Sequence, residues 1–431
     1  MRKKHLFAFV FLTLVYSCGR TPEAHLQKIG TGFAATSVNT CVFRGSSITS
    51  DSAMRLAGYY DADSLLTLAV QERGSDRWET VHTRFKGRVN DAHNIISVAL
   101  DGEGYIHLCW NQHASRMQYT RSLEPYKAVF PEPSGMTGTL EDNVTYPEFH
   151  RLSCGDLLFF YRDGSSGRGN LVLNRYSVAD KTWSRVQDVL IDGEGERNAY
   201  PQMYVDAKDN IHLSWVWRET YNVETNHDMC YAFSSDGGVT WRRTDGSEYE
   251  IPVTAASAEY AWRIPQGSEL INQTSMTADA DGHPYIATYW RDKGSDVPQY
   301  RIVWHDGREW RSRTVGHRTL PFSLSGAGTK AIPISRPQLA MTPHGPVFIF
   351  RDEERGSLVS AFTAKDLDGE WKVTDLTDFS VNLWEPSLDY EALKREGELC
   401  VFVQNSGQGD GEQLSDFPPQ PVYVMDVRMG S

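Results

Sequence analysis

Cysteine is scarce in this chain, and none of it falls in a CxxC pair. The 431 residues include six cysteines. Apart from Cys18 near the N-terminus, they are scattered over the chain as Cys41, Cys109, Cys154, Cys230 and Cys400. An odd number at irregular spacing does not predict a disulfide framework. Because Cys109 and Cys154 lie in or beside apolar runs, we expect buried free thiols.

Basic residues are outnumbered by acidic ones. Lysine and arginine total 43 against 56 aspartate and glutamate residues, which gives a formal net charge of -13. Loss of residues 1–17 would remove Arg2, Lys3 and Lys4 and no acidic residue, so the charge would become -16. Nucleic-acid binding needs a basic surface, so this balance argues against a nucleic-acid partner.

Long apolar runs are also missing, except for one near the N-terminus. Leu6 to Val15 form an apolar run of ten residues behind a basic head, and the run ends in "VYSC". It is too short to cross a bilayer and is typical of a signal peptide. Small Ser17 before Cys18 resembles a lipoprotein processing box. We therefore expect a signal peptide over 1–17, a lipid on Cys18, a tether over 18–35, and a membrane-anchored protein in the bacterial cell envelope.

Helical periodicity is absent, and a repeat of strand-like segments takes its place. Each copy has an Asp/Gly turn followed by an apolar or aromatic run, as in "DGEGYIHLCW", "SCGDLLFFYR", "DAKDNIHLSWVW", "DADGHPYIATYW" and "TPHGPVFIFRD". Apolar and polar residues alternate, as in half-buried strands. We count seven units of about fifty to sixty residues, a length that suits four strands. The sequence predicts an all-β fold, a single seven-bladed β-propeller over 36–431.

Tryptophan marks the later part of most repeats. It recurs in "DRWETV", "KTWSRV", "VTWRRT", "REWRSR" and "GEWKVT", and a gap near residue 130 fits one degenerate copy. The stretch "SSDGGVTW" fits an Asp-box, a hairpin turn in which Asp236 hydrogen-bonds backbone and the tryptophan packs between blades. We expect "PVYVMDVRM" or the early "CVFRGSSITS" to close the ring by pairing the two ends of the chain.

Three histidines stand in one short hairpin, "DAHNIISVALDGEGYIHLCWNQH". His93 precedes its first strand and His113 follows its second, so antiparallel pairing predicts that the two are neighbours at one rim of the ring. His107 lies inside the strand. We interpret it as a core histidine, because His212 holds the same place in "NIHLSW".

The next repeat carries further polar candidates in "YRDGSSGRGNLVLNRY". Tyr161 and Arg162 end an apolar strand, and Arg175 interrupts the returning one, where a charge needs a partner. Two imidazoles, a phenol and a guanidinium would together provide an acid, a base and an anion clamp.

These segments carry a resemblance to a known family. The runs "DAHNIIS", "YRDGSSGRG" and "RNAYPQMYVD" resemble BNR-repeat propellers that include ulvan lyases, rhamnosyl-glucuronate lyases and arabinogalactan rhamnosidases. The resemblance implies an acidic plant or algal polysaccharide as substrate and no cofactor for the chemistry. It also implies catalytic and substrate-binding residues. The catalytic set is His93, His113, Tyr161 and Arg175, and the substrate contacts are Asn94, Arg162 and Arg218.

The chemistry expected is β-elimination at a uronate, most specifically at rhamnosyl-α-1,4-glucuronate ends of arabinogalactan. Arg175, helped by His113, would neutralise the carboxylate so that the neighbouring C5 proton becomes acidic. Tyr161 and His93 would then serve as base and acid, in an order that the sequence leaves open.

Two other functions stay open at this point. In the rhamnosidase branch, the resemblance places a catalytic histidine in the N-terminal strand, where this chain reads "VFRGSS" with Gly45 or Ser46 instead. Ordinary hydrolysis needs two carboxylates. The acidic candidates are Glu148, Asp163, Glu219, Glu224 and Asp228. A non-catalytic glycan-binding propeller is the third reading. His227 and Asp228 have no third ligand fixed by spacing, so no metal site is predicted.

Overall fold

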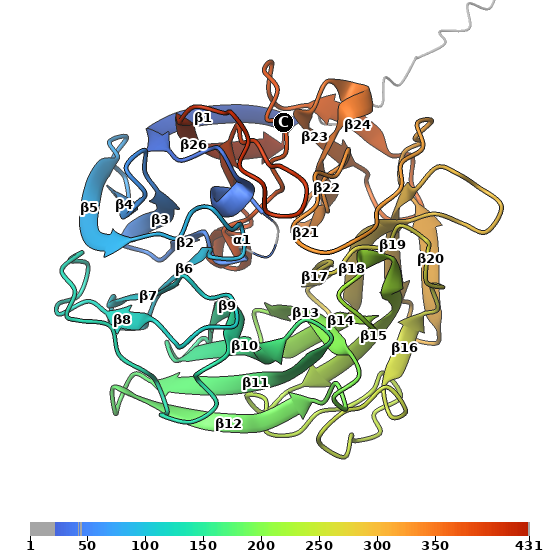
Figure 1. Cartoon of the computed structure of the whole chain (residues 1–431), viewed down its shortest axis with the longest axis horizontal. Helices are drawn as coiled ribbons and strands as arrows, with labels where there is room; N and C mark the ends of the chain where they lie inside the picture. The colour runs from blue at the N-terminus through green and yellow to red at the C-terminus, as the bar shows by residue number, and fades with distance from the viewer. Residues whose placement is uncertain (1–21, 42, 44, 430–431) are drawn as a thin grey trace, which may run out of the picture.

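The computed structural model describes residues 22–41, 43 and 45–429, and Figure 1 shows sheets that follow one another around a common centre. The expected signal peptide and Cys18 lie outside the described residues. Strands make up most of the regular structure, which confirms the all-β prediction. The regular helical segments are η1 (Ser37–Asn39), η2 (Val223–Thr225), η3 (Glu353–Arg355) and the short α1 (Tyr390–Glu396).

The first half of the described chain forms three sets of antiparallel strands. One four-stranded sheet contains β2 (Ile48–Ser50), β3 (Met54–Tyr60), β4 (Leu65–Glu72) and β5 (Glu79–Lys86). A three-stranded sheet contains β6 (Ile96–Leu100), β7 (Ile106–Trp110) and β8 (Tyr119–Arg121). The next set contains β9 (Val144–Arg151), β10 (Leu157–Ser165), β11 (Arg168–Ser177) and β12 (Thr182–Ile191).

The second half repeats the pattern. Its sets contain β13 (Asn198–Val205), β14 (Ile211–Arg218), β15 (Asn226–Ser234) and β16 (Glu259–Trp262); β17 (Ser275–Ala278), β18 (Pro284–Trp290), β19 (Gln299–His305) and β20 (Trp310–Thr314); and β21 (Gln338–Thr342), β22 (Gly345–Asp352), β23 (Leu358–Thr363) and β24 (Lys372–Asp375). The sets β9–β12 and β13–β16 join into one eight-stranded sheet through a single parallel bridge between Gly169 and Asn198.

The degenerate repeat near residue 130 corresponds to the three-stranded sheet. After β8, the place of a fourth strand is taken by an isolated bridge between Tyr119 and Ser134. The repeat that lacks the tryptophan segment is therefore also the one whose sheet lacks a fourth strand.

The recurring Asp/Gly turns share one hydrogen-bond pattern. In four hairpins an aspartate Oδ1 accepts from the backbone N–H groups two and four residues later, at 2.8–3.0 Å. The four are Asp61, Asp101, Asp206 and Asp279. Aspartate favours such turns because its short side chain satisfies backbone donors locally. An aspartate thus fixes the turn in each of these four hairpins.

The Asp-box prediction is also confirmed as a structural turn. Asp236 Oδ1 accepts from the backbone N–H groups of Val239 and Thr240 at 3.1 and 3.0 Å. Trp241 is buried, and its Nε1 donates to Gly238 O at 2.9 Å.

The two ends of the described chain pair with each other. β1 (Pro22–Gly32) runs antiparallel to β26 (Gln420–Met429), which pairs on its other side with β25 (Leu399–Gln404). Closure by "PVYVMDVRM" is therefore confirmed. The tether predicted over 18–35 is wrong for residues 22–32, because they supply the partner strand. Among the described residues of the early segment "CVFRGSSITS", Ile48–Ser50 form β2, which pairs with β3.

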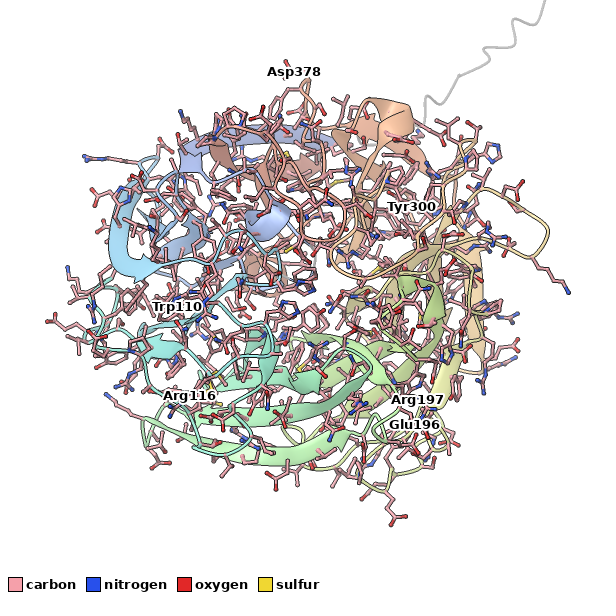
Figure 2. The ribbon with its side chains drawn as sticks, in the orientation of Figure 1. Trp110, Arg116, Glu196, Arg197, Tyr300 and Asp378 are labelled. Atoms are coloured by element: carbon pink, nitrogen blue, oxygen red, sulfur yellow. The ribbon has the colours of Figure 1, made fainter. Side chains whose placement is uncertain are left out.

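Apolar side chains between neighbouring sheets form the core. Figure 2 places Trp110 and Tyr300 inside the ring of sheets, and both are buried. Arg116 and Glu196, labelled in the same view, have exposed side chains. Cys109, Cys230 and Cys400 are buried free thiols as expected, and Cys41 is also buried. Cys154 is exposed, which corrects that prediction. Among the described residues, no helix combines the length and the apolar character needed to span a bilayer.

Candidate active site

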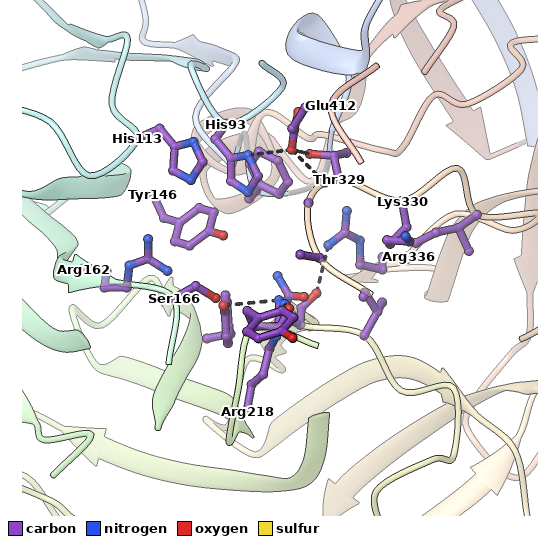
Figure 3. A pocket seen from close by; sticks show the side chains of 18 residues that line it. His93, His113, Tyr146, Arg162, Ser166, Arg218, Thr329, Lys330, Arg336 and Glu412 are labelled. Carbon is purple, nitrogen blue, oxygen red and sulfur yellow. Dashed lines mark hydrogen bonds and ion pairs between the residues drawn. The ribbon is translucent and has the colours of Figure 1, made fainter. Parts of the chain in front are cut away.

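A pocket of about 220 Å³ is lined by side chains that come from nearly the whole length of the chain (Figure 3). The residues that carry its chemistry are His93, His113, Tyr146, Arg162, Tyr200, Arg218, Arg336 and Glu412. Apolar, small and further polar residues complete it. They include Phe43, Ser166, Tyr221, Asn272, Thr329, Lys330 and Ile332.

His93 and His113 form a stacked pair, as the hairpin register predicts. Ile96 faces Trp110 across β6 and β7, which brings the two flanking histidines together. Their ring centroids are 4.0 Å apart with 12° between the planes. Phe43 stacks on the other face of His93 at 5.1 Å. The pair is therefore held in a fixed orientation at the pocket wall.

Asp91 bridges the two imidazoles. Its Oδ1 lies 2.8 Å from His93 Nδ1 and its Oδ2 lies 2.6 Å from His113 Nδ1. Although burial alone would raise it, these hydrogen bonds hold the pKa of Asp91 well below its usual range. Burial alone would lower the pKa of His93, but Asp91 and Glu412 raise it to about 9. His93 is thus a cation at neutral pH, and since both carboxylates face Nδ1, its other N–H is at Nε2.

Asp91, His93 and His113 lie close enough to one another to be considered as metal ligands. A metal would require the in-plane lone pairs of both imidazoles to converge on one point. The rings are nearly parallel, so their lone pairs run side by side instead. This geometry favours a carboxylate-bridged imidazole pair over a chelate.

Two tyrosines face the histidine pair. Tyr146 and Tyr200 have ring centroids 5.8 Å apart, and Figure 3 shows the hydroxyl of Tyr146 directed into the centre of the pocket. Burial alone would raise the pKa of Tyr200, but the charges of Arg218 and Arg162 lower it to about 8. Burial and the neighbouring Tyr200 raise the pKa of Tyr146. Because the two phenols are close together, their titrations are coupled.

A β-bulge aims Tyr146 at the pocket. On β10, Phe160 pairs with Glu148 and Arg162 pairs with Thr145. Two residues of β9, Tyr146 and Pro147, therefore lie opposite the single residue Tyr161 of β10. Tyr146 has φ 57°, a left-handed backbone that is costly for an aromatic residue. Such strain, about 1–3 kcal/mol, persists where the surrounding structure enforces it and is common at functional sites.

Arg162 and Arg218 are buried guanidinium groups without a carboxylate. They are 3% and 6% exposed, and neither forms an ion pair within the described part of the chain. Arg162 donates to Thr145 Oγ1 at 3.0 Å, while its Nε has no hydrogen-bond partner among the described residues. Arg218 donates to Tyr200 OH at 3.3 Å and to the backbone carbonyls of Thr220 and Tyr221. Their charge is left for a ligand.

The other buried arginine of the pocket is already neutralised. Arg336 pairs with Glu385 at 2.5 Å and donates to Asn272 O at 2.9 Å. Buried charges are normally paired in this way. The contrast marks Arg162 and Arg218 as an anion site.

Two residues predicted to be catalytic do not line the pocket. Tyr161 is fully buried on the opposite side of β10 from Arg162, because successive side chains of a strand point to opposite faces. Its hydroxyl donates to Leu140 O at 3.0 Å, and burial raises its pKa. Arg175 pairs with Asp156 at 2.7 Å. It faces Leu158, four residues along β10 from Arg162, so it lies near the other end of the strand.

Asn94 is likewise structural in this molecule. Its Nδ2 donates to Arg88 O at 2.9 Å, and its backbone carbonyl accepts from Tyr60 OH at 2.7 Å. The core interpretation of His107 is confirmed, since it is fully buried between Asp101 and Tyr119. His227 pairs with Glu219 and Asp228, away from the pocket lining.

Of the residues that carry the chemistry of the pocket, sequence reasoning missed Tyr146, Tyr200, Arg336 and Glu412. Tyr146 and Tyr200 stand in "TYPEF" and "AYPQM", the same place in consecutive repeats, so the shared Tyr-Pro pair could have revealed them. Glu412 carries no such signal. It lies in the connection between β25 and β26 and meets His93 only in the folded chain.

The sequence profile of the BNR repeat-containing family matches residues 55–318. The chain belongs to this family. The matched range includes the histidine pair, both tyrosines and both unpaired arginines. It excludes Glu412.

Several characterised proteins are similar to this BNR-repeat chain. An ulvan lyase of Alteromonas sp. (strain LOR) is 23% identical over 317 residues, which cover 66% of this chain and 63% of that enzyme. An ulvan lyase of Nonlabens ulvanivorans is 22% identical over 256 residues, which cover 51% and 53% of the two chains. The chain therefore spans less than two thirds of the length of these relatives.

Solved structures share the fold. Polysaccharide lyase Uly1 superposes with a TM-score of 0.67 at 16% identity, covering 93% of this chain and 92% of its own. A PL25 ulvan lyase bound to -[GlcA(1-4)Rha3S]- superposes with a TM-score of 0.62 at 16% identity, covering 90% and 96%. At this identity the likeness concerns the fold.

Proposed function

We propose that this protein is a polysaccharide lyase that cleaves a uronate-containing glycan by β-elimination. The observation that carries the proposal is the pair of buried arginines without carboxylates, Arg162 and Arg218, which face a phenol pair and an imidazole pair. A buried cation of this kind costs stability unless an anion completes it. A uronate carboxylate is planar and suits the guanidinium fork.

Carboxylate binding would also start the reaction. Elimination removes the proton at C5, which becomes acidic when the adjacent carboxylate is neutralised. Arg162 and Arg218 take the role that the sequence assigned to Arg175. Because their charge acts in a buried pocket, its effect on the developing carbanion is larger than it would be in water.

The tyrosine pair supplies the base. The two guanidinium groups favour the phenolate of Tyr200, and its neighbour Tyr146 directs its hydroxyl into the space where a sugar would lie. The proton passes from C5 to the phenolate, the C4–C5 double bond forms, and the C4–O bond breaks.

His93 fits the acid rather than the base. It is already protonated at neutral pH through Asp91 and Glu412, so it can give a proton to the leaving oxygen or hydrogen-bond the carboxylate. The neighbouring His113 is stacked on His93 and its side chain is more exposed. The protonated state of His93 supports its role as the acid in the proposed reaction.

The relatives support the substrate class. They are ulvan lyases by name, and one is bound to a glucuronate-rhamnose repeat. We propose an acidic plant or algal polysaccharide as substrate and, more specifically, rhamnosyl-α-1,4-glucuronate ends of arabinogalactan.

The rim of the pocket supports chain ends over chain interiors. Asn222 Oδ1 accepts from Gly326 N at 2.8 Å, Gly411 N donates to Thr329 O at 2.9 Å, and Ala92 N donates to Glu412 at 3.2 Å. These bonds join four connections into one wall. A volume of about 220 Å³ is small beside ordinary ligand pockets of roughly 300–1,000 Å³, and suits one or two sugar rings.

Hydrolysis fits the pocket less well. A glycosidase needs two carboxylates on either side of the bond, and Glu412 is the single carboxylate that lines the pocket in the described chain. Gly45 or Ser46 stands where the rhamnosidase-type histidine is expected, and a Cβ added at Gly45 would lie 2.6 Å from the Glu148 carboxylate. A pure binding module would not require the charged imidazole and the phenol pair.

Two further expectations enter the proposal. Counting β9–β12 and β13–β16 as separate blades gives a seven-bladed β-propeller. Cleavage before Cys18 and its lipidation would anchor that propeller in the bacterial cell envelope.

Product mass tests the reaction. The protein and a His113→Ala variant are incubated with a rhamnosyl-glucuronate oligosaccharide, and the products are weighed by mass spectrometry. Elimination gives a uronate product lighter by one water than hydrolysis gives, and the variant should lose it. A hydrated product from the unmodified protein would overturn the lyase assignment.

A further inference from the structure

Glu412 reaches the histidine pair from the far end of the chain. We infer that Glu412, in the connection between β25 and β26, is a positioning residue that fixes the His93 imidazole and keeps it cationic. The inference deepens the proposed function and rests on it for its catalytic meaning. The contact itself can be measured separately.

The Glu412 carboxylate is held by groups from several segments. Its Oε1 accepts from Thr329 N at 2.7 Å and Thr329 Oγ1 at 2.6 Å, and it lies 3.1 Å from His93 Nδ1. Its Oε2 accepts from Ala92 N at 3.2 Å. Figure 3 shows this chain of contacts at the upper edge of the pocket. The carboxylate is therefore fixed before any substrate binds.

The backbone around Glu412 is shaped for this contact. Gly411 and Glu412 both have φ 68°, a conformation that favours glycine and is strained at Glu412. A Cβ on Gly328 would lie 2.8 Å from Gly411 Cα, so the two connections meet where only glycine fits. A strained glutamate held by four contacts indicates a role that another residue would not fill.

The charges around His93 explain why two carboxylates matter. Asp91 and Glu412 face Nδ1, while His113 is stacked on one side and Tyr146 lies 5.8 Å away. Arg336 lies on the far side of Phe43, 5.7 Å from that ring. Asp91 is shared with His113, so Glu412 is the carboxylate that serves only His93 within the pair. Without it, Asp91 alone would oppose the effect of burial, and the pKa of His93 would be lower.

The test is a Glu412→Gln variant of the full mature protein. Glutamine keeps the size and removes the charge. The titration of His93 is followed by NMR of its imidazole, and kcat/KM is measured against pH. The midpoint for His93 should move to lower pH by about one to two pH units, and the alkaline limb of kcat/KM should move with it.

Asp410→Asn is the matched control. Asp410 lies in the same connection and pairs with Lys330 at 2.6 Å, so this variant removes a charge without touching His93. It should leave the His93 midpoint in place. If Glu412→Gln does not fold, Thr329→Val, which removes one hydrogen bond to Glu412, should move the midpoint in the same direction by less.

The outcomes separate the two proposals. A His93 midpoint that falls in Glu412→Gln, in a protein without lyase activity, supports the positioning role and overturns the proposed function. An unchanged midpoint in a protein that is an active lyase overturns the positioning role.

Discussion

Arg162 and Arg218 hold two positive charges in a buried pocket with no carboxylate of the described chain to balance them. The fold keeps them there through Thr145, Tyr200 and backbone carbonyls, which orient the guanidinium groups without neutralising them. Such an arrangement is poor for stability and good for binding an anion.

Arg162→Gln should lower kcat/KM on the uronate substrate by about 10²–10³-fold, because it removes a charged donor at the developing carbanion. The free energy of unfolding should stay the same or rise, since an unpaired buried charge is lost. Kinetics and urea unfolding of one preparation measure both. Arg175→Gln is the control. It should keep kcat/KM within about twofold, because its partner Asp156 lies outside the pocket lining.

The pH dependence of kcat/KM should be bell-shaped. The base requires ionised Tyr200, with a pKa of about 8, and the acid requires protonated His93, with a pKa of about 9. Activity should therefore rise as pH approaches 8 and fall above 9. An optimum below pH 7 would contradict these roles.

The raised pKa of His93 also makes the free energy of unfolding depend on pH. Its folded value of about 9 exceeds the unfolded value of about 6.5, so its contribution is complete below pH 6.5 and is lost as pH rises through 9.

Residue types were easier to predict than residue positions. The histidine pair follows from hairpin register, because His93 and His113 flank paired strands. Tyr161 precedes the pocket residue Arg162 on β10, but side-chain alternation turns it to the opposite face. Arg175 lies on the paired strand β11, where the register places it opposite Leu158, away from Arg162. The bulge at Tyr146 depends on the pairing of β9 with β10, so the periodicity of the sequence does not predict it.

At the scale of elements, the ring is closed by the first and last described strands. β1 pairs with β26 over most of its length, and Ile29 of β1 is buried against β25 and β26 residues such as Phe402 and Val424. The sequence predicted closure and its C-terminal strand. It could not predict β1, because "PEAHLQKIGTG" lacks the apolar alternation of the other strands.

Ile29→Ala should lower the free energy of unfolding by about 2–5 kcal/mol, the usual cost of truncating a buried isoleucine. Lys28→Ala, at the exposed neighbouring position, should change it by less than about 0.5 kcal/mol. Urea unfolding of the two variants measures the difference. Equal stability would mean that β1 does not hold the ring closed.

At the scale of the whole molecule, the acidic chain concentrates unpaired positive charge in one pocket. The formal net charge is -13, yet the pocket presents Arg162 and Arg218 to solvent-borne ligands. A local positive site on an acidic protein suits a short anionic chain end better than a long polyanion, which would be repelled by the surrounding surface.

Lipidation of Cys18 would place this pocket at a membrane surface. The protein expressed with its N-terminal segment should fractionate with membranes, and Cys18→Ala should appear in the soluble fraction with unchanged kcat/KM. Mass spectrometry of the N-terminal peptide identifies the acyl chains. A soluble, unacylated wild-type protein would contradict the anchor.

The most direct test of β-elimination compares the amount of unsaturated uronate formed with the amount of rhamnose released. Mature protein is incubated with gum arabic and with ulvan, and the ultraviolet absorbance of unsaturated uronate is followed together with free rhamnose. We predict absorbance and rhamnose that rise in equal amounts on gum arabic and vanish in Arg162→Gln. Rhamnose released without absorbance would contradict the lyase mechanism.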